Sequence, residues 1–169
     1  MIDESTFQSF YERTKQSLWL YVVRMMKDDA LADDIFQDAY IRFLQSSVEH
    51  TGESQMKSYL YRIATNLIND HWRKMKRERN WLEADTAREP TIDKGNTIDL
   101  QHDLNEAFHQ LSQQQRSLLW LAYAEEYEHK EIAEILKLRV KSVKVLLFRA
   151  KQKLMEVCHR MGITSEGTL

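Results

Sequence analysis

Residues 126–154 read EYEHKEIAEILKLRVKSVKVLLFRAKQKL. Apolar side chains recur at spacings of three and four on both sides of residue 137, which predicts two short helices around a tight turn. From Lys137 onward the stretch holds seven Lys and Arg residues and no acid. A basic helix that follows a short helix and a tight turn commonly places its side chains in the major groove of DNA. The stretch therefore predicts a helix-turn-helix whose partner is DNA.

The second helix of this motif has an apolar face and a basic face. At 100° per residue, Val143, Leu147 and Ala150 face the first helix, where Ala133 is small enough to let the helices approach closely. Lys and Arg on the opposite face suit phosphates or guanine, and an apolar side chain suits a thymine methyl. The residues that we expect to contact DNA from this motif are Arg139, Lys141, Ser142, Lys144, Val145, Phe148 and Arg149. The alternative is a solvated basic helix without a nucleic-acid partner.

The composition of the whole chain predicts an all-α protein with local attraction for DNA. The 169 residues include four Gly and one Pro, and 43% of them are apolar, which is enough to bury a core. The formal net charge is −2, so affinity for nucleic acid must rest on local patches. The single cysteine forms no intramolecular disulfide, and no apolar run approaches the roughly 20 residues needed to span a bilayer. We therefore expect a cytoplasmic protein without membrane insertion.

The first half of the chain predicts three helices, at about residues 5–27, 30–45 and 56–79, with a small polar loop at 46–55. The second of these helices carries acidic residues on its outward face. The third is long, roughly 35 Å at about 1.5 Å per residue. Its far end, residues 72–79, holds five basic residues and one acid. The charge of this half is thus divided between an acidic helix and a basic one.

A change of composition separates the two halves. Residues 80–99 contain the only Pro, a Gly and few large apolar residues, which predicts an acidic, flexible linker. Helical periodicity then resumes, and Ser112 with Gln115 has the pattern of a capping box at a helix start. We expect two small helical domains joined by the linker, the second a bundle of about four helices. The expected boundaries are residues 1–79 for the first domain, 80–99 for the linker, 100–160 for the second domain and 161–169 for a disordered tail.

Further segments of both halves carry a family pattern. ADDIFQDAYIRF stands at residues 32–43 and MKSYLYRIATNLINDHWR at 56–73. LSQQQRSLL at 111–119 is followed by EIAEIL at 131–136 and SVKVLLFRA at 142–150. In this order, and over nearly the whole chain, the segments closely resemble the extracytoplasmic-function (ECF) sigma factors of bacterial RNA polymerase. Their co-occurrence is far more specific than the helix-turn-helix alone.

The resemblance implies a fold and a role. The two domains would be the sigma-2 and sigma-4 modules, without the third domain that lies between them in larger sigma factors. Such proteins bind core RNA polymerase, recognise the minus-ten and minus-thirty-five promoter elements, and help to melt the DNA into single strands. The resemblance also implies an anti-sigma factor as a restraining partner.

The resemblance assigns work to two helices of the first half. The acidic helix matches the segment that docks on the clamp of the largest polymerase subunit, and an acidic, amide-rich face suits an Arg-rich partner. Stabilisation of the helix dipole is the alternative role for its acids. The implied polymerase-binding residues are Asp33, Asp34, Gln37, Asp38 and Arg42. The loop at 46–55 and the long helix match the part that captures an unpaired base of the non-template strand. The implied minus-ten residues are Tyr61, Arg62, Asn66, Asn69, Arg73, Lys74, Lys76 and Arg77.

The helix-turn-helix departs from the family pattern at several positions. Lys137 stands where the family usually has Gly, and Arg139 where a small hydroxyl residue often caps the second helix. A Lys in a left-handed turn costs about 1 kcal/mol. Val145 and Phe148 replace more polar residues, and they alternatively belong to a surface that a regulator covers. These departures concern the reading of the minus-thirty-five element rather than the fold.

Other classes of function account for less of the sequence. A stand-alone helix-turn-helix regulator at operator DNA explains the second half but leaves the charged helices of the first half without a task. A helical adaptor that binds only proteins leaves both basic patches unexplained. An enzyme is not expected, because the chain lacks a phosphate-binding Gly-rich loop and a nucleophile elbow. His102 and His109 are about 10 Å apart along one helix, too far to share a metal ion directly. We expect no catalytic residue, metal site or cofactor.

Overall fold

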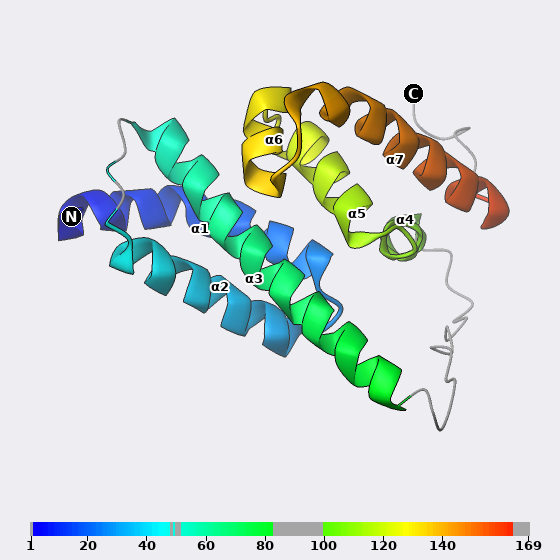
Figure 1. Ribbon diagram of the computed structural model, residues 1–169, viewed down its shortest axis with the longest axis horizontal. Coiled ribbons are helices and arrows are strands. Elements are labelled where there is room, and N and C mark those ends of the chain that lie inside the picture. Colours follow the sequence, from blue (N-terminus) through cyan, green and yellow to red (C-terminus); the bar gives the residue numbers. More distant parts are fainter. Residues whose placement is uncertain (1, 48, 50–51, 83–99, 164–169) are drawn as a thin grey trace.

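The computed structural model describes residues 2–47, 49, 52–82 and 100–163, and helices are the only regular elements of this part of the chain (Figure 1). The expectation of an all-α fold is confirmed. The elements are α1 (Glu4–Met25), α2 (Asp29–Gln45), α3 (Glu53–Leu82), α4 (Leu100–His109), α5 (Gln113–Leu119), the π-helical turn η1 (Trp120–Ala124), α6 (His129–Leu136) and α7 (Val140–Arg160).

Two Asp side chains mark the starts of α1 and α2. Asp3 accepts a hydrogen bond from the backbone N–H of Thr6 at 2.8 Å, and Asp28 accepts one from Ala30 at 2.8 Å. Each bond satisfies a donor that the first helical turn leaves unpaired. The apolar faces of both helices pack against α3. The core of this half includes Phe10, Leu18, Phe43, Leu60 and Ile68.

The long helix α3 extends beyond its expected bounds. It begins at Glu53 rather than Met56, because the helical hydrogen bonds already start with the Met56 N–H, which donates to the Gly52 carbonyl at 3.1 Å. It ends at Leu82, so residues 80–82 are helix and not linker. The rest of the expected linker lies outside the described residues.

Two capping boxes begin the short helices of the second half. Ser112 and Gln115 exchange side-chain to backbone hydrogen bonds at the start of α5, as the sequence pattern predicts. Glu128 and Glu131 make the same exchange at the start of α6. Between them, α5 continues into η1, and π-helical turns of this kind are frequent at functional sites.

The end of α7 is closed by the first residues of the expected tail. Gly162 adopts a φ of 74°, the left-handed geometry that commonly ends a helix. The Ile163 N–H then donates to the Cys158 carbonyl at 2.9 Å. Residues 164–169, for which we expected disorder, lie outside the described residues.

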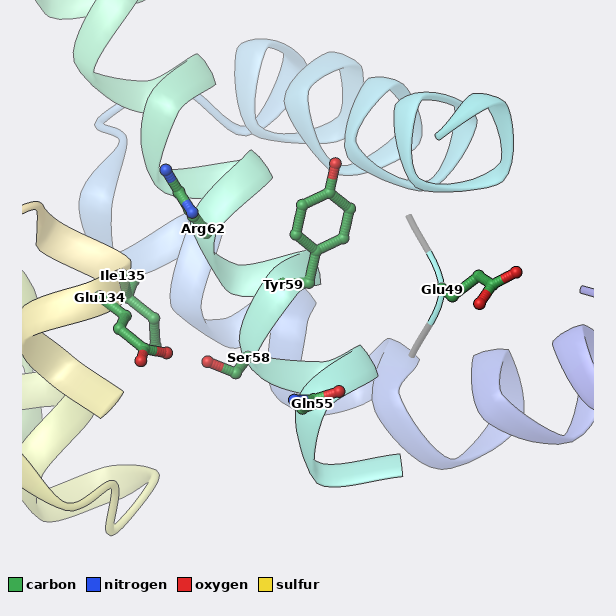
Figure 2. Close-up of a pocket in the computed structure, with 7 residues that line it drawn as sticks. All are labelled: Glu49, Gln55, Ser58, Tyr59, Arg62, Glu134 and Ile135. Atoms are coloured by element: carbon green, nitrogen blue, oxygen red, sulfur yellow. The ribbon is translucent and has the colours of Figure 1, made fainter. Parts of the chain in front are cut away.

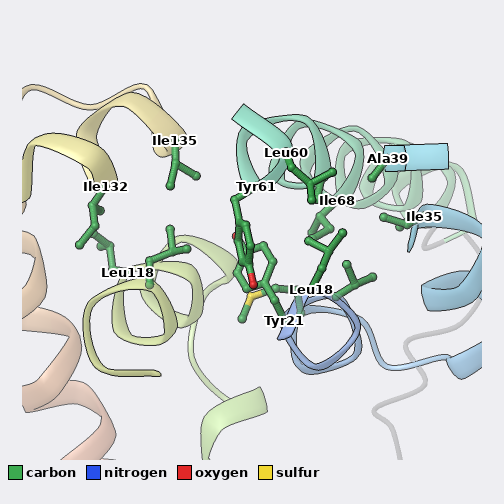
Figure 3. Packing of buried hydrophobic residues seen from close by; sticks show 14 of the residues in the cluster. Leu18, Tyr21, Ile35, Ala39, Leu60, Tyr61, Ile68, Leu118, Ile132 and Ile135 are labelled. Atoms are coloured by element: carbon green, nitrogen blue, oxygen red, sulfur yellow. The ribbon is translucent and has the colours of Figure 1, made fainter. Parts of the chain in front are cut away.

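The two halves of the chain share one continuous core. Helix α3 lies between α2 and α6, and α5 packs on α1 (Figure 1). Figure 3 shows Tyr21 and Tyr61 at the junction, facing Leu118, Ile132 and Ile135 of the second half, and all five are buried. The second half therefore lies directly against the helix that is expected to bind the melted strand.

Candidate functional site

The outward face of α2 brings the expected polymerase-binding residues together. Asp33, Asp34, Gln37 and Arg42 are exposed, and Asp38 is half-buried. Arg42 Nε lies 3.2 Å from Asp38 Oδ2, and Gln37 Nε2 donates to Asp33 Oδ2 at 3.2 Å. Such surface pairs contribute little to stability, so a partner can displace them. The face carries three Asp side chains and one Arg, and it is therefore negatively charged.

Other acids serve the dipole of α2. Asp28 caps this helix, and Asp29 is the acidic residue of its first turn. The field of a helix dipole falls off within the first turn, and Asp33 already lies beyond it. Asp28 and Asp29 therefore suffice to stabilise the start of the helix, and the acids of the α2 face are not needed for this purpose. The exposed side chain of Ile41 adds an apolar group to the same helix surface.

A surface pocket of about 200 Å³ lies at the start of α3 (Figure 2). It is lined by Glu49, Gln55, Ser58, Tyr59, Arg62, Glu134 and Ile135. The last two belong to α6, and Figure 2 shows them across the pocket from residue 49. Amide, hydroxyl, guanidinium and aromatic groups are those that hydrogen-bond to and stack on nucleobases. The volume is below the roughly 300–1,000 Å³ of pockets for drug-sized ligands.

The far end of α3 carries the expected basic surface. Arg73, Lys74, Lys76 and Arg77 are all exposed. Arg73 Nη2 lies 3.4 Å from Asp70 Oδ1, and the other three have no acid partner among the ion pairs of the described residues. A shallow hollow of about 530 Å³ runs along this surface. The arrangement suits the phosphates of a nucleic-acid backbone.

Trp81 is a residue of this region that the sequence analysis did not single out. Its side chain is 86% exposed and lies one turn beyond Arg77. An exposed Trp beside basic residues offers a stacking face for a base. The signal was an aromatic residue directly after the basic run, but the expected helix end at residue 79 placed it in the linker.

Tyr61, which we expected on a DNA-binding surface, is buried in this structure. Its side chain is 0% exposed, and its hydroxyl donates to Glu125 Oε1 at 2.7 Å and lies 3.1 Å from Ser17 Oγ. Burial and the Glu125 carboxylate raise the pKa of Tyr61. The second half of the chain covers the flank of α3 on which Tyr61 lies.

Two Asn residues of α3, both among the expected minus-ten residues, are less accessible than the basic residues near them. Asn69 accepts a hydrogen bond from Gln113 of α5, which engages it within the protein. Asn66 is half-buried, whereas Arg62 between the pocket and α6 is exposed. Of the expected minus-ten residues, the basic ones are therefore open and the tyrosine and Asn69 are occupied.

The outward face of α7 agrees with its projection. Arg139, Lys141, Lys144 and Arg149 are exposed, and Ser142 is half-buried. Two apolar side chains lie among these residues, Val145 at 50% and Phe148 at 61% exposure. The opposite face is buried through Val143, Leu147 and Ala150. The structure thus presents one basic surface with two apolar contacts at its centre.

The turn before α7 keeps left-handed geometry although Lys stands at the position where the family usually has Gly. Lys137 adopts φ 56° and ψ 49°, which is left-handed, and its N–H donates to the Ala133 carbonyl. Arg139 precedes α7 and forms no side-chain cap. The Ser142 N–H donates instead to the Arg139 carbonyl at 2.9 Å. The helix-turn-helix therefore forms with a strained Lys and without a hydroxyl cap.

The two histidines considered in the sequence analysis, His102 and His109, lie on α4 and do not form a metal site. His102 Nε2 lies 3.3 Å from Glu106 Oε1 on α4. Burial and the nearby Arg116 lower the pKa of His109 to about 4, so this imidazole is neutral at pH 7. Over the described ranges, no three His, Cys, Asp or Glu side chains come together as metal ligands. None of the described helices is both long and apolar enough to cross a membrane.

Two family profiles and several curated relatives match the chain. The family Sigma-70 region 2 matches residues 10–78, and the family Sigma-70, region 4 matches residues 101–154. The ECF RNA polymerase sigma factor SigM of Bacillus subtilis is 25% identical over 164 residues, which are 95% of this chain and 99% of SigM. SigX of the same organism is 28% identical over 157 residues, which are 86% of this chain and 80% of SigX.

A solved structure shares the fold. The sigma factor RpoE in complex with the anti-sigma factor NepR, from Bartonella quintana, has a TM-score of 0.74 and 23% identity, and the match covers 90% of this chain and 96% of that one. At this identity the likeness concerns the fold. The two profiles follow the order of the segments quoted above and together span most of both halves. The chain therefore belongs to the extracytoplasmic-function sigma factors of bacterial RNA polymerase.

Proposed function

We propose that three surfaces of this sigma factor divide the work of transcription initiation. As an ECF sigma factor, the chain binds core RNA polymerase, recognises promoter elements and helps to open the DNA. In our assignment α2 docks on the polymerase, α3 holds the minus-ten element, and α7 reads the minus-thirty-five element. This activity places the protein in the cytoplasm, with the polymerase and the chromosome.

The α2 face docks on core polymerase through Asp33, Asp34, Gln37, Asp38 and Arg42. The support is a set of acids that neither cap the helix nor serve its dipole. Carboxylates and an amide on one face suit a partner rich in Arg, because guanidinium groups form two parallel hydrogen bonds to a carboxylate. The exposed Ile41 adds apolar area to the same contact.

Helix α3 holds the separated strand at the minus-ten element. The α3 side of the pocket at the start of the helix receives an unpaired base once Glu134 and Ile135 of α6 have moved away from it, with Arg62 and Asn66 beside it. Arg73, Lys74, Lys76 and Arg77 neutralise the phosphates of the strand further along the helix. Stacking on aromatic groups and phosphate contacts together compensate for the base stacking that melting removes. Asn69 joins this surface once it is released from Gln113.

Helix α7 reads the minus-thirty-five element in the major groove. Lys141, Lys144 and Arg149 supply phosphate or guanine contacts, while Arg139 and Ser142 approach from the N-terminal end of the helix. Val145 and Phe148 lie at the centre of this surface and contact thymine methyl groups. The surface is open to solvent, so no rearrangement of α7 is needed.

One observation carries the proposal, namely the acidic α2 face in the same chain as the basic α7 face. A stand-alone operator-binding regulator needs α7 but has no use for an acidic surface that repels DNA. An anti-sigma factor is a further proposed partner of this chain. Its support is the shared fold with a sigma factor whose structure contains such a partner, together with the exposed apolar residues of α7.

The proposal is tested by mixing the full chain with bacterial core polymerase and a library of promoter fragments. We expect a stable complex that selects fragments with two separated elements, and permanganate-reactive thymines at the minus-ten element of those fragments. A stand-alone regulator would bind DNA equally well without core polymerase and would open none of it. That result would exclude the sigma-factor role of these surfaces.

A further inference from the structure

A polar clamp centred on Glu125 joins the two halves of the chain. Glu125 follows η1 in the second half, and its side chain is only 7% exposed. It accepts a hydrogen bond from the Tyr61 hydroxyl at 2.7 Å and pairs with Lys57 Nζ at 3.2 Å. Both partners belong to α3. A carboxylate in this position is held by two groups at once, one charged and one neutral.

Aromatic rings enclose the same clamp. The Lys57 ammonium group lies 5.8 Å from the centre of the Tyr61 ring and 5.9 Å from that of Tyr127, distances typical of cation–π contacts. Tyr61 and Tyr127 meet edge to face with 5.7 Å between ring centres. The ion pair is therefore shielded from water, which strengthens it relative to the exposed pairs of α1 and α2.

A second contact between the halves is made by a buried cation, Arg116. Arg116 of α5 is 4% exposed and lies over the Trp72 ring of α3 at 5.7 Å. It donates to the carbonyls of Leu111 at 2.7 Å and Met25 at 3.4 Å, and no carboxylate of the described residues pairs with it. Burial lowers the pKa of this guanidinium, and a buried cation without a counter-charge is costly. The interface thus holds one carboxylate through a charged partner, and one buried cation through carbonyl groups and an aromatic ring without a carboxylate.

The closed arrangement occupies the surface assigned to the minus-ten strand. Glu134 and Ile135 of α6 form part of the pocket at the start of α3 (Figure 2). Tyr61 is buried by the second half, and Asn69 is engaged by Gln113. The Glu134 carboxylate would also repel a phosphate that approaches the pocket. A strand and the second half of the chain therefore compete for one face of α3.

We infer that the free protein rests in a closed state, in which its second half covers the strand-binding face of α3 and Glu125 clamps the two halves together. The inference rests on the proposed assignment of α3 to the minus-ten element. The apparent affinity for the strand is the intrinsic affinity reduced by the open fraction. In the closed state the segment from α5 to α6 of the same chain covers this face of α3. The surface of α7 stays exposed in the same state, so closure affects one promoter element only.

The closed state is tested first by measuring the distance between two spin labels, one in each half of the chain. Spin labels on Gln16→Cys and Glu156→Cys, in a Cys158→Ser background, lie on exposed positions of α1 and α7. We expect one narrow distance distribution for the parent chain and a broader, longer one for Glu125→Lys, because this change sets two ammonium groups against each other. Lys57→Glu combined with Glu125→Lys should restore the narrow distribution. Glu126→Lys is the matched control, because Glu126 is next to the clamp but exposed. This variant should leave the distance distribution of the parent chain unchanged.

The second measurement is binding of the full chain to a fluorescent single-stranded DNA with the minus-ten sequence of a promoter that its holoenzyme opens. Glu125→Lys should bind about tenfold more tightly than Glu126→Lys, which carries the same charge change, while binding to minus-thirty-five duplex is equal. Circular dichroism verifies that both variants remain helical. Equal strand affinities, or a parent distance distribution that Glu125→Lys leaves unchanged, would overturn the closed state. If no variant binds the strand even with core polymerase, the assignment of α3 fails, and with it the competition on which the inference rests.

Discussion

The two basic helices, α3 and α7, carry similar charge but differ in what surrounds them. The side of α7 that we propose to contact DNA is open to solvent, with Phe148 61% exposed at its centre. The corresponding side of α3 is partly covered, because the second half buries Tyr61 and engages Asn69, whereas Arg62 and the basic residues at the far end are exposed. Basic charge on a helix therefore indicates a nucleic-acid surface but does not indicate whether that surface is available.

The difference originates in how many sides of each helix are packed. Helix α7 buries one stripe, formed by Val143, Leu147 and Ala150, so its remaining surface faces solvent. Helix α3 buries Leu60 and Ile68 in the first half and also presents Tyr61 to the second half. A helix packed on two sides has no single outward face. Its accessible residues depend on contacts between segments far apart in the chain.

The largest expected effect separates polymerase binding from DNA binding. Replacing both Asp34 and Asp38 with Lys reverses the charge of the α2 face and should weaken core-polymerase binding by about 100-fold, since like charges across an interface cost several kcal/mol. Binding of the free chain to minus-thirty-five duplex should not change, because the residues that we propose to contact this duplex lie on α7 and not on α2. Fluorescence titration with core polymerase and with duplex DNA measures both. Unchanged core affinity would remove the docking role of α2.

The next effect concerns the open helix. Lys144→Ala combined with Arg149→Ala should lower the affinity for minus-thirty-five duplex by about 30-fold and reduce the slope of its salt dependence by about one for each of the two side chains that contacts a phosphate. Lys130→Ala on α6 is the matched control, because it removes an exposed charge away from the α7 face. If the control and the double variant behaved alike, general charge rather than the α7 surface would govern binding.

A smaller effect concerns the turn that positions α7. Lys137 has a positive φ, and a Lys in this conformation costs roughly 1 kcal/mol that Gly avoids. Lys137→Gly should therefore stabilise the protein and raise its melting temperature by about 3 °C. Glu134→Gly, inside α6, should have the opposite sign, because Gly is unfavourable within a helix. A lower melting temperature for Lys137→Gly would show that contacts of the Lys side chain outweigh the backbone strain.

Periodicity and capping chemistry predict most of the individual elements, but not the bounds of α3 or the π-helical turn η1. The Ser112 capping box, the left-handed Lys137 and the buried stripe of α7 are all local features, set by residues within a few positions of one another. The sequence predicts too early an end for α3, because the basic run resembles the end of a helix. Trp81 therefore falls within the expected linker. The position of Tyr61 was not predictable, since a buried tyrosine hydroxyl needs a partner, and Glu125 is remote in sequence.

The smallest expected effect tests the apolar centre of the α7 surface. If Val145 or Phe148 packs against a thymine methyl, replacing that thymine with deoxyuridine removes one buried methyl, worth about 0.8 kcal/mol or fourfold in affinity. We expect this loss at one or two thymines of the minus-thirty-five element, and the same thymines should become insensitive in Phe148→Ala or Val145→Ala. Because the base pairing and phosphates are unchanged, the comparison isolates the methyl contact from the basic residues around it. Uniform affinity for every deoxyuridine duplex would mean that the basic residues read this element alone, and that the exposed Phe148 serves a protein partner instead.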